Sequence, residues 1–171
     1  MLQEHAKVLL LLEQAGEVVG RKKLQKMVYI TQKLRFDFNQ RFYFHFYGPY
    51  SEELTLEVEE LCDLGFLEEV LEDKGNYNVY RYRITDKGKD FLQHVKADVG
   101  NLLPVLAQQM NASSARFLEL VSTVLYFERL PREEVEEKIQ TLKAKSNYTT
   151  DEITDAYTWI EGLRKTVQLS G

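Results

Sequence analysis

The sequence predicts a mainly α-helical α+β fold, in which a winged helix-turn-helix-like domain with a small antiparallel β wing precedes a C-terminal helical region. Residues 42–67 read as an aromatic strand, a Gly-Pro turn, a helix and a second strand. Helical patterns at 2–15 and 21–34 precede this stretch, and only helical patterns follow the first domain. We therefore assign residues 1–96 to the winged-helix-like domain. Residues 97–171 form the helical region, which we expect to pack on that domain or to mediate dimerisation.

The first two helices differ in character. Helix 2–15 is apolar on most sides from Val8 onward, which is typical of a helix near the centre of a core. Gly16 ends it, and residues 18–20 are expected to form a short extended link. Helix 21–34 has one apolar stripe, and its basic side chains are expected to point to solvent: Arg21, Lys22, Lys26 and Lys33.

The middle of the chain begins with residues 42–47, which predict a strand partly covered on both faces. Gly48-Pro49 is expected to break this strand. Ser51 can cap the third helix, which ends near Gly65. The exposed side of this helix carries carboxylates and no basic residue: Glu52, Glu53, Glu57, Glu59, Glu60 and Asp63.

The wing is predicted by two alternating segments, 66–71 and 77–85, on either side of a Gly-containing turn at 73–76. Tyr80, Tyr82 and Ile84 share one face of the return strand, which we expect to face the core. Thr85 and Asp86 then begin a helix that runs to about Val95.

The second half of the chain predicts helices only. One helix occupies 101–110, and the next is capped by Asn111 or Ser113 and runs to Leu130. Pro131 is expected to begin a helix that buries Val135, Ile139 and Leu142. Thr149 with Glu152 three residues later is a capping-box pattern at the start of the last helix.

The charge is unevenly distributed along the chain, whose net charge is −5. Residues 20–41 carry seven basic residues and one acid, whereas residues 51–95 carry twelve acids and five basic residues. In most winged helices the third helix enters the DNA major groove, and here its carboxylates would repel phosphates. DNA binding would therefore need the basic stretch and the wing: Arg21, Lys22, Lys26, Arg81 and Arg83.

Enzyme chemistry lacks support in the sequence. His5, His45 and His94 are scattered without metal-ligand spacing, and no phosphate loop, dinucleotide fingerprint or nucleophile elbow is present. His45 is interpreted as a structural histidine among tyrosines. Cys62 lies beside the buried stripe of an acidic helix, a position expected to raise its thiol pKa. We expect no catalytic residue, no cofactor and no metal.

The compartment is expected to be the cytoplasm. The longest apolar run is residues 8–12, far short of the ~20 residues that cross a bilayer. The start of the sequence lacks the pattern of a secretory signal, and a single cysteine forms no intramolecular disulfide. No membrane association is expected.

Three segments carry a family resemblance: 20–30 (GRKKLQKMVYI), 46–54 (FYGPYSEEL) and 61–67 (LCDLGFL). Together they resemble the uncharacterised YwgA family of Bacillus-type bacteria over most of the chain. More distantly, the Lys-Leu-Gln-Lys sequence followed by an aromatic-Gly-Pro turn resembles the Panacea domain of SocA-type antitoxins, over about residues 20–65. The Panacea resemblance implies an antitoxin or adaptor that grips a partner protein, and neither resemblance implies a catalytic residue.

Two functions follow as hypotheses. The first is a non-enzymatic adaptor or regulator that contacts a protein partner or a second copy of itself, as a homodimer. Its candidate partner-binding residues are Tyr47, Tyr50, Glu53, Glu57 and Glu60. The alternative is a DNA-binding transcriptional regulator that uses the basic stretch and the wing. A continuous positive surface from 21–41 to 81–83 would favour DNA, and an interrupted one would favour a protein partner.

Overall fold

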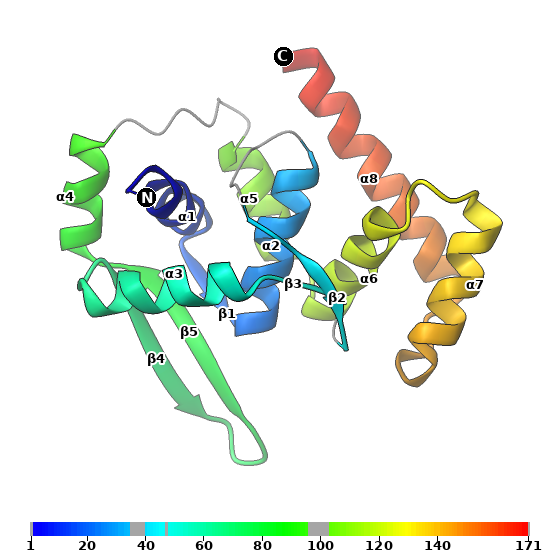
Figure 1. The fold of residues 1–171 in the computed structure, drawn as a ribbon, viewed down its shortest axis with the longest axis horizontal. Helices are drawn as coiled ribbons and strands as arrows, with labels where there is room; N and C mark the ends of the chain where they lie inside the picture. The colour runs from blue at the N-terminus through cyan, green and yellow to red at the C-terminus, as the bar shows by residue number, and fades with distance from the viewer. Residues whose placement is uncertain (1, 35–39, 47, 96–102, 171) are drawn as a thin grey trace.

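The computed structural model describes residues 2–34, 40–46, 48–95 and 103–170 (Figure 1). Within these residues the chain is mainly helical with small antiparallel sheets, in agreement with the α+β class expected from the sequence. The elements follow in the order α1 (Leu2–Ala15), β1 (Glu17–Val19), α2 (Arg21–Lys33), β2 (Tyr43–His45), β3 (Gly48–Tyr50), α3 (Glu52–Asp63), β4 (Leu67–Asp73), β5 (Asn78–Ile84), α4 (Asp86–His94), α5 (Leu103–Ala112), α6 (Ala115–Tyr126), α7 (Arg132–Leu142), η1 (Ala144–Ser146) and α8 (Thr150–Ser170).

Helix α1 is the centre of the first half of the chain. Its apolar side chains at Val8, Leu9, Leu11 and Leu12 have no exposed surface. The helix packs against α3, α4, α5 and β5, so nearly every side of it meets another element. Figure 1 looks almost along α1, with α4 on its left and α3 crossing below it. The expectation of a core helix is confirmed.

The larger sheet has the strand order β1-β5-β4, with both pairings antiparallel. Val18 pairs with Tyr82 in one register and Leu67 pairs with Ile84 in the other. Tyr82 and Ile84 are buried, as their alternation predicts. The short extended link expected at 18–20 is extended at Val18 and Val19, and the structure adds that residues 17–19 pair with β5 as a third strand.

The smaller sheet joins β2 to β3, with Phe44 opposite Pro49. The strand expected at 42–47 is confined to three residues, and Gly48-Pro49 is part of β3 rather than a break. The expected cover on both faces is absent, since Tyr43 is 62% exposed and His45 is also exposed. Phe44 alone of the strand points inward, against aromatic rings of α6 and the residue that follows it.

The second half of the chain packs directly on the first. Helix α5 lies against α1 and α2, helix α6 lies against α2 and β3, and α8 covers α6. A single cluster of buried side chains includes Leu9 and Met27 from the first half and Leu118 and Val121 from the second. The expected boundary at residue 96 lies outside the described residues, and the two halves on either side of it share one core.

Details of the C-terminal helices differ from expectation. Ser114 caps α6 by accepting a hydrogen bond from the Phe117 N–H, because the Asn111 side chain instead donates to the carbonyls of Ala15 and Glu17. Leu142, expected to be buried, is 51% exposed. None of the described helices has the length and hydropathy to cross a membrane.

Candidate functional site

The position of α3 is fixed by a glutamine of α2. The Gln25 amide donates to the Ser51 carbonyl at 2.9 Å and accepts from the Ser51 N–H at 2.9 Å. Ser51 has no exposed surface, and its hydroxyl caps α3 by accepting from the Leu54 N–H. Leu54, Val58 and Leu61 then face the core, so the opposite side of α3 faces solvent.

The Lys-Leu-Gln-Lys motif at 23–26 in α2 holds other elements of the fold in place. Lys23 Nζ donates to the Asn111 carbonyl at 2.7 Å, and Lys26 Nζ donates to the Pro49 carbonyl at 2.6 Å. Together with Gln25, these side chains hold the end of α5, strand β3 and the start of α3 around one helix. The motif on which the family resemblance rests therefore joins segments that are far apart in the sequence.

Lys26 requires a correction. It was expected to face solvent and to contact nucleic acid, but only 2% of its surface is exposed. Helix α6 and strand β3 pack against α2, so Lys26 is enclosed. A buried ammonium cannot reach a DNA phosphate without rearrangement of the fold.

The carboxylates proposed for partner contact are engaged within the chain. Glu60 meets His5 Nε2 at 2.7 Å, and Glu53 lies 3.7 Å from the Arg41 guanidinium. Glu57 accepts a hydrogen bond from Gln40 at 2.6 Å, and burial raises the pKa of its carboxyl.

The two tyrosines of the same hypothesis are placed differently. Tyr50 is half-buried and shares a 2.7 Å hydrogen bond with the Thr55 hydroxyl, so its polar end is already occupied. The edge of its ring also meets His45, with 5.3 Å between ring centroids. Tyr47 lies outside the described residues.

A different set on α3 forms the exposed stripe. Glu52, Leu56, Glu59 and Asp63 follow the spacing of one helix face, and all are exposed. Leu56 is 58% exposed, and the three carboxylates form no hydrogen bond or ion pair with any described residue. The helical spacing was available in the sequence, but the internal partners of the other carboxylates were not. We call these residues the α3 stripe.

The arginines proposed for nucleic-acid contact are paired with carboxylates. Arg81 forms ion pairs with Glu72 and Glu17, and Arg83 pairs with Glu68 at 2.8 Å. Each arginine lies next to a carboxylate of β4 or β1, so the wing presents little net positive charge.

The start of α2 continues the same pattern. The Arg21 guanidinium stacks 3.7 Å from the centre of the Tyr80 ring, donates to the Tyr82 hydroxyl, and lies 3.5 Å from Glu69. Lys22 is exposed beside it. The positive charge between α2 and the wing is therefore interrupted by carboxylates, and DNA contact through these residues stays a prediction.

The pKa of the Cys62 thiol is raised, as its position beside the buried stripe of α3 suggested. Burial is the main cause that raises the pKa of its thiol to about 11, and the carboxylates of Glu69 and Asp63 act in the same direction. A thiol with such a pKa is almost entirely protonated near neutral pH, and it is a poor nucleophile there.

Comparison with known proteins gives one close match. No family model matches the chain. Over 165 residues the chain is 52% identical to the Bacillus subtilis (strain 168) protein named "Uncharacterized protein YwgA". This alignment covers 96% of the present chain and 99% of the relative. At this identity and coverage the chain belongs to the YwgA family.

Proposed function

We propose that this protein is a non-enzymatic adaptor or regulator of the winged-helix type, antitoxin-like, which acts by binding a basic surface of another protein through the α3 stripe. The order α1-β1-α2-β2-β3-α3-β4-β5 supports the winged-helix part of this proposal, because β1, β4 and β5 form one sheet and β2-β3 is a separate hairpin between α2 and α3. The observation that carries the binding part is a row of carboxylates around an exposed leucine, which form no hydrogen bond or ion pair with any residue that the structure describes.

The chemistry of the stripe favours a protein over DNA. Glu52, Glu59 and Asp63 would repel phosphates at distances shorter than the screening length of about 8–10 Å. The same charges would steer a basic protein toward α3 and speed association. Leu56 supplies an apolar contact at the centre of the stripe, where interfaces exclude water.

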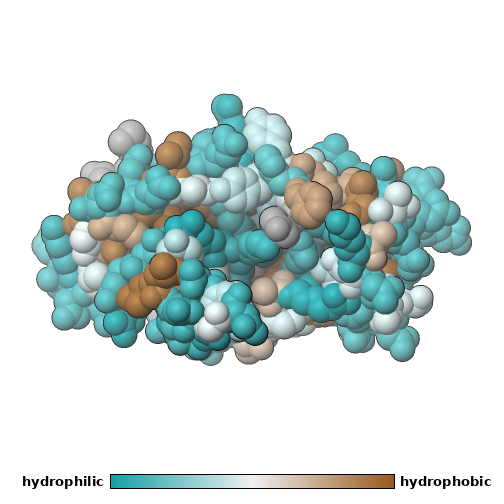
Figure 2. Space-filling view, turned by 90° about the horizontal axis from the view of Figure 1, so that it is seen from below, coloured by the Kyte–Doolittle hydropathy of each residue, from teal (hydrophilic) through white to brown (hydrophobic). Residues whose placement is uncertain are grey.

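The face of the molecule in Figure 2 supports a small contact led by charge. Figure 2 shows hydrophobic residues as small separate patches among hydrophilic ones on the face seen from below. Large obligate interfaces are more apolar than this. We therefore expect a reversible partner whose binding weakens as salt concentration rises.

The test compares two double variants that make the same change in net charge. Glu59→Lys with Asp63→Lys reverses the α3 stripe, and Glu133→Lys with Glu137→Lys reverses exposed carboxylates on α7. Each full-length variant carries an affinity tag and is expressed in the native host, where cross-linking is followed by mass spectrometry. We expect one dominant partner with a basic surface to be lost with the α3 variant and kept with the α7 variant.

The same proteins separate the protein hypothesis from the DNA hypothesis. Duplex fragments are titrated at about 50 mM and about 200 mM salt with fluorescence anisotropy as the readout. Salt-sensitive duplex binding that Arg21→Gln with Lys22→Gln abolishes would replace the present proposal with DNA binding. Equal partner capture by both double variants would also refute the role of the α3 stripe.

A further inference from the structure

A cleft of about 850 Å³ lies between the two halves of the chain. Its walls are the start of α2, strand β2 with the residue after it, the start of α6, and the end of α7 with η1. The volume falls within the range of about 300–1,000 Å³ that is typical of sites for small molecules. The cleft is separate from the α3 stripe, and none of the stripe residues lines it.

The described residues that line this cleft are strongly cationic. They include one carboxylate and five cationic side chains, which are Lys22, Lys26, Arg116, Lys143 and Lys145. Lys26 and Lys143 are 2% and 5% exposed, so they form the buried part of the wall. The other three are exposed, and they surround the opening. Focusing of positive charge in a cleft attracts anions.

Lys26 is a buried cation whose hydrogen-bond partner is a neutral carbonyl. Its Nζ atom donates to the Pro49 carbonyl, and it forms no ion pair with any described residue. Burial lowers its pKa to about 8, with Lys143 and Lys22 acting in the same direction and Glu119 opposing them. An ammonium without a buried counter-ion is costly, and an anion that enters the cleft would supply one.

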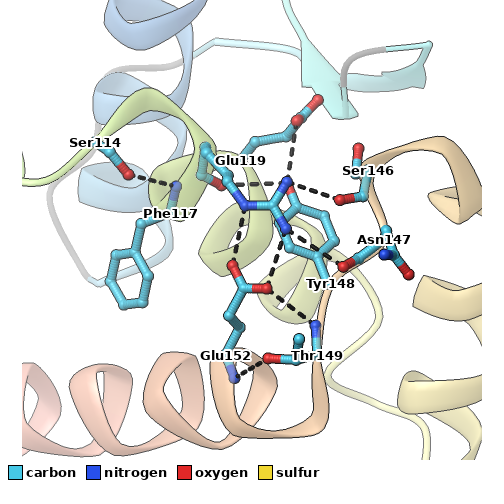
Figure 3. A network of polar contacts seen from close by, with 9 residues as sticks. Ser114, Phe117, Glu119, Ser146, Asn147, Tyr148, Thr149 and Glu152 are labelled. Carbon is cyan, nitrogen blue, oxygen red and sulfur yellow. Dashed lines mark hydrogen bonds and ion pairs between the residues drawn. The ribbon is translucent and has the colours of Figure 1, made fainter.

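The single carboxylate of the cleft is already neutralised. Glu119 lies 3.2 Å from Lys143 Nζ and accepts a hydrogen bond from the Tyr148 hydroxyl at 3.1 Å. Arg116 is held by Glu152, with distances of 2.9 Å and 3.0 Å to its two oxygens. Figure 3 shows the part of this network around Tyr148, with Glu119 above and Glu152 below in the view. Lys26 and Lys145 form no ion pair with any described residue.

Aromatic rings form another wall of the cleft. Phe46 is 77% exposed, and Lys145 Nζ lies 6.0 Å from the centre of its ring. Phe44 is half-buried and packs against Tyr126 and Phe127. An exposed phenylalanine beside several lysines suits a ligand that combines an anionic group with a flat ring.

We propose that this cleft binds a small phosphorylated molecule of the nucleotide class, with its phosphate groups at Lys22, Lys26 and Lys145 and its base against Phe46. Phosphate oxygens accept the charge-assisted hydrogen bonds that ammonium groups donate. The base gains by stacking on an exposed ring. The walls come from both halves of the chain, so the ligand would bind only to the folded whole.

The test is isothermal titration calorimetry of the full chain with ADP, GDP, CDP and UDP, the parent nucleosides and inorganic phosphate. Lys22→Gln with Lys145→Gln removes two exposed cations of the cleft, and Lys89→Gln with Lys165→Gln removes two exposed cations elsewhere. We expect a nucleoside diphosphate to bind with one-to-one stoichiometry. The cleft variant should bind it at least about tenfold more weakly, and the control variant should bind it normally.

Further arms separate the parts of the proposal. Phe46→Ala should weaken nucleotide binding and leave phosphate binding unchanged, because phosphate does not stack. Equal affinity for nucleotide and phosphate would refute the ring contact. Absence of nucleotide and phosphate binding at about 1 mM, a low-affinity range, would refute the site. Binding of an octaglutamate peptide in place of nucleotides, sensitive to the cleft variant, would overturn the nucleotide proposal and assign the cleft to acidic peptides.

Discussion

Replacement of Gln25 by methionine tests whether the Gln25 side chain on α2 fixes the position of α3. The Gln25 amide brackets the backbone of Ser51 with two hydrogen bonds and also donates to the Thr55 hydroxyl at 3.1 Å. Methionine keeps the length of the side chain and removes all of these bonds. The helix that carries the exposed stripe would then lose the contact that fixes where it begins.

The cost follows from which groups are left without partners. The Ser51 N–H is buried and loses its hydrogen-bond acceptor, which costs about 1–3 kcal/mol. The Ser51 carbonyl still accepts from the Thr55 N–H and hydroxyl, so its loss is the smaller value of about 0.5–1.5 kcal/mol. The free energy of unfolding should fall by about 2–4 kcal/mol, or roughly 5–15 °C in Tm for a chain of this size.

Urea titration followed by far-UV circular dichroism measures this change, with Gln140→Met as the matched control. Gln140 is exposed on α7, so the same substitution there should change the free energy of unfolding by less than about 0.5 kcal/mol. Equal stability of the two variants would refute the argument that Gln25 positions α3.

Three further predictions concern other positions. Gly88→Ala should lower Tm strongly, because the added Cβ would overlap the Phe66 carbonyl. Gly162→Ala should raise the free energy of unfolding by about 0.5–1 kcal/mol, since nothing lies within 4 Å of the added Cβ. Thermal unfolding of the two variants measures both changes. Hydrogen bonds from Arg116 are the main cause that lowers the pKa of the Glu152 carboxyl to about 2. The contribution of this ion pair to the free energy of unfolding is therefore fully present above pH ~4.3 and is lost as the pH falls toward 2. Arg116→Gln should therefore cost up to about 1 kcal/mol more at pH 7 than near pH 2, because the Arg116 hydrogen bond to the Ser146 carbonyl is lost at both pH values. An equal cost in urea titrations at both pH values would contradict the ion-pair assignment. Cys62 should react with iodoacetamide at pH 8 at least about a hundredfold more slowly than the urea-unfolded chain, with the rate rising toward pH 11; similar rates would mean that burial does not protect it.

Features that depend on a few neighbouring residues could be predicted from the sequence. The Ser51 cap acts over three residues, and Thr149 and Glu152 exchange the two hydrogen bonds of a capping box. The β4–β5 turn likewise closes locally, where the Gly75 N–H donates to the Asp73 carboxylate. Side-chain and backbone chemistry within one turn decides such features, so no distant segment is needed to predict them.

Features that depend on distant segments could not be predicted. Strand β1 has three residues, too few for a period, and it exists because β5 offers hydrogen bonds. Lys26 lies off the apolar stripe of α2, and its burial comes from β3 and α6. Glu60 and Glu59 are both exposed carboxylates of α3, but of the two only Glu60 forms a hydrogen bond within the described residues, to His5 at 2.7 Å. The sequence pattern around each of these residues does not reveal the distant segment that contacts it.

The core shared by the two halves has a consequence for how this protein can change in evolution. In this chain α1 and α2 bury apolar surface against α5 and α6. Recombination between the halves would leave each product with Leu9, Met27, Leu118 or Val121 facing water. Gene fusion and domain shuffling are therefore constrained to the outside of the whole unit, and 52% identity along 96% of the chain accords with inheritance as one piece.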